Sequence, residues 1–161
     1  MSNPAQSRPT PRYLDIGDRV WPATRRFMGA HTFLYRRTGG RIGHTIPGVS
    51  GKMLLLDHVG AKSGTRRTSP LLYVRDGEDI VVVASKGGFP KHPAWFHNLK
   101  ANPETTVQVG SHLLPVRARV ATPEERQRLW EMAVKAYPGY ENYAVRSKGR
   151  EIPLVVLEPR S

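Results

Sequence analysis

The sequence predicts an α+β fold, in which helices pack around a small barrel-like sheet of mainly antiparallel strands. Six apolar or alternating segments indicate strands, at about residues 52–59, 68–75, 79–85, 104–110, 112–121 and 152–157. Turn signals at Asp76-Gly77 and Gly110-Ser111 join neighbouring segments as hairpins. Three further segments have helical spacing or helix caps. With 161 residues, of which 39% are hydrophobic, the chain can bury one core of its own.

The first predicted helix spans about residues 18–37, and Gly39-Gly40 ends it. Residues 1–16 are polar and contain several prolines, so we expect a disordered arm followed by one domain over residues 17–161. The helix can cover the core or a pocket, which we favour, or it can lie on an anionic membrane through its arginines. Its apolar stripe, which we expect to face the sheet, comprises Val20, Trp21, Phe27, Met28, Leu34 and Tyr35.

Two more helices are predicted in the second half of the chain. A short middle helix runs from Pro93, as its first residue, to about Ala101. A longer helix precedes the last strand, with Thr122 as its N-cap and Glu125 completing a capping box. Pro138-Gly139 is expected to end it. Its core-facing side chains are expected to be Leu129, Trp130, Ala133 and Ala136.

The chain is strongly basic, with a formal net charge of +12 from 25 basic and 13 acidic residues. Such a charge suits an acidic ligand, a nucleic acid or an anionic membrane, and does not choose among them. The absence of cysteine excludes disulfides, thiolate metal sites and thiol nucleophiles. The N-terminus has no signal-peptide core and no apolar run approaches membrane-spanning length, so we expect a cytoplasmic protein.

The most informative stretch is the turn between the first two predicted strands, at residues 60–67. Gly60 and Gly64 bound it, and it carries Lys62, Arg66 and Arg67. Small residues let backbone N–H groups approach an anion that the cations neutralise, so the turn can hold a phosphate or carboxylate. It is not a nucleotide-binding P-loop, because the glycine spacing differs and strands flank it. The alternative is a basic hairpin turn that only water contacts.

Three other stretches can line a ligand site. Residues 82–88 end a strand with a hydroxyl, a cation and two glycines, although this is also how an ordinary strand ends. Residues 93–103 carry Trp95, Phe96 and Asn98, and these aromatics can equally fill the core. A third set of side chains can line a pocket for a flat aromatic molecule or simply edge the core, namely Tyr137, Tyr140 and Tyr143.

No catalytic machinery is visible in the sequence itself. The histidines (residues 31, 44, 58, 92, 97 and 112) have no metal-ligand spacing, and we expect them to be solvated or in the core. There is no nucleophile elbow either. A ligand-binding turn without a nucleophile or metal site suggests that a cofactor supplies the chemistry.

In consistent order, these motifs resemble the deazaflavin-dependent nitroreductase family of actinobacteria and their relatives. The resemblance covers roughly residues 17–159. The motifs that carry it are Gly60-Ala-Lys-Ser-Gly64, Arg67-Thr-Ser-Pro70, Ala84-Ser-Lys-Gly-Gly88, Trp95-Phe-His-Asn-Leu-Lys-Ala-Asn-Pro103 and Tyr137-Pro-Gly-Tyr140.

The resemblance implies a split β-barrel, similar to that of FMN-binding oxidases, which binds coenzyme F420. The polyanionic tail of this deazaflavin would match the basic chain. Cofactor-binding positions carried over from the family comprise Ala61, Lys62, Ser63 and Arg67 for the phosphate and tail, Thr68, Ser69, Pro70, Leu71 and Leu72 along the cofactor, Val83, Ala84, Ser85 and Lys86 at the ring system, and Ala94, Trp95 and Asn98 on its other side.

The implied reaction is hydride transfer from reduced F420 to a quinone such as menaquinone, with nitroaromatics as adventitious acceptors. Residues that would line the acceptor pocket and activate the acceptor are Ser85, Tyr137, Tyr140 and Tyr143. The sequence departs from the family at Ala61, where some members carry Arg, and at Leu72, where nitroimidazole-reducing members carry Tyr.

Two other functions remain open on the same fold. One is an FMN-dependent oxidoreductase, and the other is a non-catalytic carrier of a fatty acid or similar anion. Nucleic-acid binding is not expected, because the sequence has no recognition motif or stacking platform. The sequence leaves open whether the protein is a monomer or a homodimer.

Overall fold

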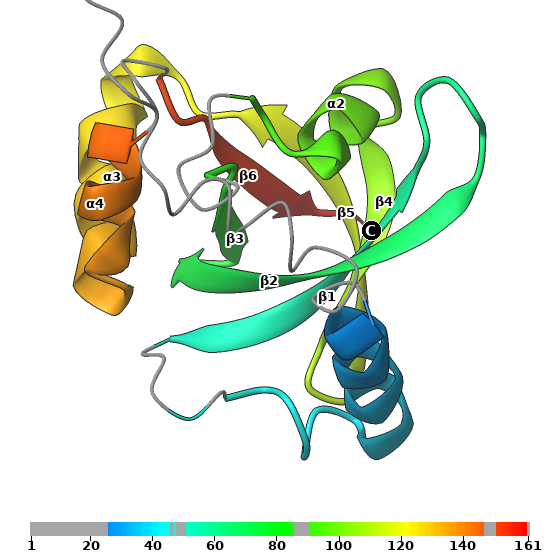
Figure 1. Ribbon diagram of the computed structural model, residues 1–161. Coiled ribbons are helices and arrows are strands. Elements are labelled where there is room, and N and C mark those ends of the chain that lie inside the picture. Colours follow the sequence, from blue (N-terminus) through cyan, green and yellow to red (C-terminus); the bar gives the residue numbers. More distant parts are fainter. Residues whose placement is uncertain (1–25, 46, 48–50, 86–90, 147–150, 161) are drawn as a thin grey trace, which may run out of the picture.

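A six-stranded antiparallel barrel forms the centre of the molecule (Figure 1). The computed structural model describes residues 26–45, 47, 51–85, 91–146 and 151–160. The barrel closes in the order β1-β2-β3-β6-β5-β4, with every neighbouring pair antiparallel, which confirms the predicted barrel-like α+β fold. The strands are β1 (Lys52–Val59), β2 (Arg66–Asp76), β3 (Asp79–Val83), β4 (Glu104–Val109), β5 (His112–Val120) and β6 (Leu154–Pro159).

The alternation of side chains along β1 explains why its sequence is apolar throughout. Leu54 and Leu56 point into the barrel, while Met53 and Leu55 point to its outer face. All four are buried, because the first helix covers the outer face of this strand. A strand that is covered on both faces loses the usual alternation of polar and apolar residues.

The helix α2 (Ala94–Ala101) covers one end of the barrel (Figure 1). Its Trp95, Phe96 and Leu99 are buried together with the interior side chains of the strands. The prediction of this helix is therefore confirmed. Pro93 is its N-cap rather than its first residue, because its ψ of 150° is extended.

Two helices, α3 (Pro123–Ala136) and α4 (Gly139–Arg146), pack against the outer face of β3 and β6. The predicted capping box is present, with the Thr122 N–H donating to the Glu125 carboxylate at 3.0 Å. Leu129 and Ala133 of α3 are buried as predicted. The sequence predicts only the end of a helix at Pro138-Gly139, and α4 is an additional helix. A proline without an N–H ends one helix and also suits the position just before another.

The first described helix, residues 26–38, stands against the outer face of β1. Tyr35 anchors it, because its buried hydroxyl donates to the Met53 carbonyl (2.9 Å) and accepts the Gly110 N–H (2.8 Å). Gly40 ends the helix at φ +82°, and a Cβ there would lie 2.7 Å from the Gly110 Cα. The close contact with the β4–β5 turn therefore requires glycine.

Two of the four described residues in the predicted apolar stripe of this helix are exposed. Phe27 is 66% exposed and Leu34 is 41% exposed, whereas Tyr35 is fully buried. Helical spacing identifies an apolar side, but it does not say how much of that side a neighbour covers. Val20, Trp21 and the predicted arm at residues 1–16 lie outside the described residues.

Candidate functional site

Strands β2 and β3 separate at one end of the barrel. In the described chain they pair only between Tyr73–Asp76 and Asp79–Val82. The first half of β2 runs on past the end of β3 with β1 as its strand neighbour (Figure 1). Beyond β3, the Ala84 N–H donates instead to the Pro153 carbonyl at 2.9 Å. If the β2–β3 register continued, the facing residues would be Leu72 with Val83, Leu71 with Ala84, and Pro70 with Ser85.

The predicted anion-binding turn joins β1 to β2 at the far end of this unpaired segment. The Gly64 N–H donates to the Gly60 carbonyl, and the Gly60 N–H donates to the Thr65 carbonyl, both at 2.9 Å. Gly64 has a φ of +68°, and a Cβ added to Gly60 would collide with the Ser63 hydroxyl. The left-handed backbone therefore favours glycine at position 64, whereas a side chain at position 60 would displace the Ser63 hydroxyl.

The outer side of the turn offers both cations and backbone donors. Lys62, Arg66 and Arg67 are exposed. Within the described part of the chain, the N–H groups of Lys62 and Ser63 have no protein acceptor. Consecutive amides without acceptors form a concave anion site, and nearby cations strengthen it. The turn is thus suited to a phosphate or carboxylate group.

A buried polar network lies beneath the turn. His58 and Asn98 are 5% and 7% exposed, and the Asn98 amide lies 2.9 Å from His58 Nδ1. The other side of the His58 ring contacts the Ser69 hydroxyl at 2.9 Å, and Asn98 Oδ1 accepts the Ala61 N–H at 2.9 Å. The network therefore connects β1, β2, α2 and the first residue after Gly60. Burial, followed by the charge of Arg67, lowers the pKa of His58, which favours a neutral ring.

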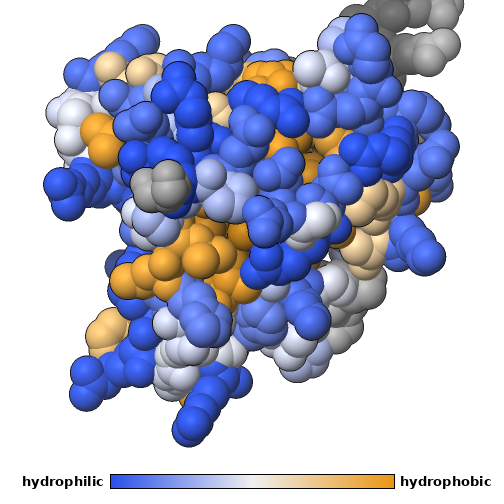
Figure 2. Space-filling model, turned by 180° about the vertical axis from the view of Figure 1, so that it is seen from behind, coloured by the Kyte–Doolittle hydropathy of each residue, from blue (hydrophilic) through white to orange (hydrophobic). Residues whose placement is uncertain are grey.

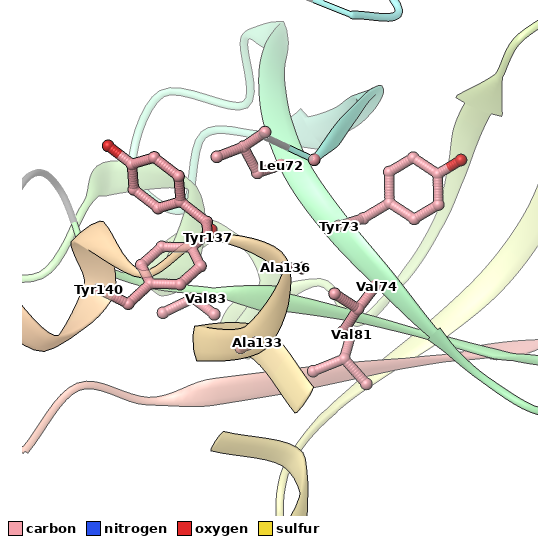
Figure 3. A pocket seen from close by; sticks show the side chains of 10 residues that line it. Leu72, Tyr73, Val74, Val81, Val83, Ala133, Ala136, Tyr137 and Tyr140 are labelled. Carbon is pink, nitrogen blue, oxygen red and sulfur yellow. The ribbon is translucent and has the colours of Figure 1, made fainter. Parts of the chain in front are cut away.

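A small pocket lies on the outer face of the barrel, where β2 and β3 separate (Figure 3). Its volume of about 10 Å³ has room for roughly one water molecule. Tyr137 and Tyr140 form one wall, with ring centroids 5.0 Å apart in an edge-to-face arrangement. Leu72 lies opposite them, and the Tyr73 ring extends away from the tyrosine pair. The remaining lining residues are Gly51, Val74, Val81, Val83, Ala133 and Ala136.

The structure brings most of the predicted site residues into three groups along β2. Lys62, Ser63 and Arg67 lie at the turn, with Ala61 and Ser69 tied to Asn98 through the buried network. Residues that line the tyrosine pocket are Leu72, Val83, Tyr137 and Tyr140. Residues on the inner side or at the barrel end are Leu71, Ala84, Ser85, Ala94 and Trp95, of which only Ala94 is exposed.

Some predicted residues are not part of these groups. The Thr68 side chain faces the outer side of the barrel, where its hydroxyl donates to Asp57 at 2.7 Å. Asp57 also accepts a hydrogen bond from Arg36 of the first helix at 2.9 Å. Lys86 and the side chain of Tyr143 lie outside the described residues.

Sequence reasoning assigned no role in the site to His58, Tyr73 or Val74. His58 was expected to be a solvated or core histidine. A signal existed, because His58 follows Leu54 and Leu56 in steps of two and is therefore a polar residue on the inward face of β1. Tyr73 and Val74 follow Leu72 directly, but only the three-dimensional position of α3 and α4 identifies them as pocket residues.

Comparisons with known proteins identify the relatives of this chain. Residues 27–159 match the family described as F420H2-dependent quinone reductase. An F420H2-dependent quinone reductase of Mycobacterium tuberculosis (strain H37Rv) is 45% identical over 133 residues, which is 81% of this chain and 88% of that protein.

Two solved structures are also similar. A structure of an F420H2-dependent reductase has 45% identity and a TM-score of 0.61, and the match covers 66% of this chain and 93% of that one. A second structure, described as a domain-swapped dimer, has 39% identity and a TM-score of 0.63, with coverage of 88% and 98%.

Proposed function

This chain belongs to the F420H2-dependent quinone reductase family, and we propose that it transfers a hydride from reduced F420 to a quinone. The observation that carries the proposal is the separation of β2 and β3. Among the described residues it leaves the first half of β2 with β1 as its only strand neighbour, with a cationic turn at one end and a tyrosine-lined apolar pocket at the other. A cofactor with a flat ring and an acidic tail needs these two environments at its two ends.

The residues at the turn fit the phosphate and tail of F420. Lys62 and Arg67 would neutralise the anions, and the N–H groups of Lys62 and Ser63 would donate to phosphate oxygens. Leu72 lies five positions after Arg67 in β2, a span of roughly 16 Å in an extended strand. The charged end of the ligand would therefore lie well apart from its reactive ring.

The reacting end would be held by Leu72, Val83, Ala84 and Ser85. Bound reduced F420 supplies the hydride, so the protein needs only to position the donor and acceptor and to exclude water. Apolar side chains at the strand separation would exclude water. The Tyr137 hydroxyl would donate a hydrogen bond to a quinone oxygen as negative charge develops there.

The acceptor is proposed to be a planar quinone, with menaquinone as one candidate and nitroaromatics as adventitious acceptors. The pocket in this structure is too small for a quinone ring, so binding requires its walls to move apart. The wall formed by Tyr137 lies at the junction between the end of α3 and the start of α4. We propose that this junction moves when a quinone binds.

We further propose that the protein binds peripherally to the inner face of an anionic membrane, where a lipid quinone would be found. Phe27, Phe33 and Ile42 are 66%, 63% and 52% exposed. Figure 2 shows an apolar area among hydrophilic residues on the rear face. None of the described helices is long and apolar enough to cross a membrane. Exposed cations that accompany the aromatics on this segment are Arg26, Arg37 and Arg41.

Vesicle co-sedimentation tests the membrane proposal. A Phe27→Ser/Phe33→Ser variant should bind vesicles of anionic phospholipid several-fold more weakly than the wild type, because apolar burial drives insertion. Leu113→Ser is a matched control, since Leu113 is 62% exposed on β5. Equal binding of both variants and the wild type would contradict the proposal.

A fluorescence titration with oxidised F420 tests the main proposal, with FMN as the parallel ligand. We expect F420 to bind more tightly than FMN, and F420H2 to reduce a soluble menaquinone analogue when the protein is present. Tighter FMN binding would instead identify an FMN-dependent enzyme. Ligand binding without turnover of any quinone would identify a carrier.

A further inference from the structure

The orientation of the buried network can be deduced from one unambiguous donor. The Ala61 backbone N–H can only donate, so the Asn98 atom that it meets must be the amide oxygen. The amide nitrogen of Asn98 therefore faces His58, to which it donates. His58 Nδ1 must then accept, and it carries no proton. This assignment needs no assumption about the histidine itself.

The same reasoning continues to Ser69. A neutral imidazole with an unprotonated Nδ1 carries its proton on Nε2. His58 Nε2 lies 2.9 Å from the Ser69 hydroxyl oxygen and donates to it. The Ser69 hydroxyl proton must then point elsewhere. Ser69 belongs to the half of β2 that has no β3 neighbour in the described chain, and a ligand bound along that segment would be the acceptor for this proton.

We propose that His58 is a positioning residue for the cofactor site: its neutral Nε2–H form orients Asn98, which holds the start of the anion-binding turn, and directs the Ser69 hydroxyl proton toward the ligand. This inference rests on the proposed F420 function for the identity of the ligand. The network itself does not depend on that function.

Protonation of His58 would break this arrangement. A proton on Nδ1 would face the amide N–H of Asn98, and two donors cannot share a hydrogen bond. If the amide rotated to offer its oxygen to His58, the Ala61 N–H would lose its acceptor. Either outcome loosens the turn whose amides and cations bind the anionic ligand.

The two charged groups near His58 act in opposite directions, and burial favours the neutral ring. Arg67 of β2 is its cross-strand partner and opposes a second positive charge, whereas Asp57 of β1 favours it. The α2 helix presents the neutral Asn98. Burial is the largest cause of the lowered pKa. Since the pKa of His58 is lowered, F420 affinity should be constant at neutral pH and fall only at a pH below the ordinary histidine pKa of about 6.5.

Two variants separate the two hydrogen bonds of His58, the one with Asn98 and the one with Ser69. His58→Asn keeps an acceptor near the Nδ1 position for Asn98 and cannot titrate. His58→Gln keeps a donor near the Nε2 position for Ser69 and loses the acceptor. We expect F420 to bind His58→Gln roughly tenfold more weakly than the wild type at pH 7.5, and His58→Asn within about threefold. The exposed His112 provides the matched control variant His112→Asn.

The pH profile distinguishes positioning from a purely structural role. F420 affinity of the wild type and of His112→Asn should fall together below about pH 6.5, whereas that of His58→Asn should stay flat. A loss of stability alone would not remove the pH dependence. If His58→Asn follows the wild-type profile, the proposal is overturned.

A measurement on the unliganded wild-type protein keeps the test independent of folding and of F420. Long-range ¹H–¹⁵N correlations of the histidine rings should show His58 with its proton on Nε2. A proton on Nδ1 would overturn the proposal, even if all variants failed to fold. If the wild type showed no F420 binding at all, the proposed function would fail, while the ring spectrum would still decide the hydrogen-bonding network.

Discussion

The two halves of β2 have opposite characters. The first half, Arg66 to Leu71, pairs with β1, carries cations and hydroxyls, and meets the buried His58 network. The second half, Leu72 to Asp76, pairs with β1 at its first two residues and with β3 from Tyr73 onward. It lines an apolar pocket with α3 and α4 behind it. One strand therefore joins a polar environment for binding an anion to an apolar environment for a reaction.

This difference separates affinity from chemistry. Exposed cations attract an anion over several ångströms, and solvent and salt weaken this attraction. Buried apolar and aromatic side chains act by shape and by excluding water. Changes in the first half of β2 should therefore alter cofactor affinity, and changes in the second half should alter turnover. Four predictions test that division.

The largest effect is expected from removing two cations at the turn. Lys62→Ala/Arg67→Ala should weaken F420 binding by roughly 100-fold, because each charge-assisted hydrogen bond contributes about 1.5–3 kcal/mol. The melting temperature should stay within about 2 °C, because both side chains are exposed. A fluorescence titration measures the affinity. The control variant Arg117→Ala/Lys135→Ala removes the same amount of charge from β5 and α3. An equal loss of F420 affinity in the two double variants would show that only net charge matters.

Tyr137→Phe should lower kcat/KM for a quinone by roughly tenfold, because one hydrogen bond to the developing oxyanion is lost. The affinity for F420 should not change, since Tyr137 belongs to the pocket and not to the turn. Steady-state kinetics and a titration on the same preparation measure both quantities. A change in F420 affinity equal to the change in turnover would contradict the division of β2 into two roles.

Salt should act on one end of the site and not on the other. Raising the ionic strength from about 0.1 to about 1 M shortens the screening length from about 10 to about 3 Å, so F420 affinity should fall roughly fivefold. The KM for an uncharged quinone should change less than about twofold. Chloride and acetate should give the same result. If the F420 dissociation constant and the quinone KM rose by the same factor, the two ends of the site would not be independent.

The smallest effect concerns the helix that supports the apolar end. Hydrogen bonds from Arg119, followed by the Thr122 N–H, lower the pKa of Glu125 to about 2. The stabilisation that these bonds provide is complete above the ordinary glutamate pKa of about 4.3 and is lost as the pH falls toward about 2. Glu125→Gln should lower the free energy of unfolding by about 1 kcal/mol at pH 7, with a smaller difference at pH 3.

Urea unfolding at both pH values measures this effect. The neighbouring Glu124 is exposed in the first turn of α3, so Glu124→Gln should cost only a few tenths of a kcal/mol. Ala133 and Ala136 of α3 line the pocket. Turnover should therefore decline as α3 loses stability, whereas the affinity for F420 should not change. An equal loss of stability at both pH values would contradict the assigned role of the carboxylate.

Local features of the fold could be predicted from the sequence because their causes are local. The β2–β3 hairpin follows from Asp76-Gly77, and the start of α3 follows from Thr122 and Glu125. The strand pattern predicts a barrel-like sheet and the family resemblance implies a split β-barrel, but neither identifies which strands meet where the barrel closes. Closure depends on pairing between Leu55–Leu56 and Val107–Gln108, which are far apart in the chain.

The candidate site shows the same limit. The glycines and cations of the turn are readable in the sequence, because a positive φ favours glycine and an anion site favours cations. The connection of His58 to Asn98 spans 40 positions, and no periodicity reports it. The exposed Phe27 was also misassigned, since an apolar residue at helical spacing gives no information about the neighbour that it meets.

The half of β2 that lacks a β3 neighbour in the described chain has a consequence for solubility and assembly. A strand with one open side is a template onto which another chain can add, and so a starting point for aggregation. Pro70 has no N–H to offer an incoming strand, and like charges at Arg66 and Arg67 would repel a second copy that approached in parallel register. The segment that we assign to the cofactor thus also resists unwanted strand addition. Pro70→Val would be expected to make the protein aggregate sooner at high concentration while leaving the barrel intact.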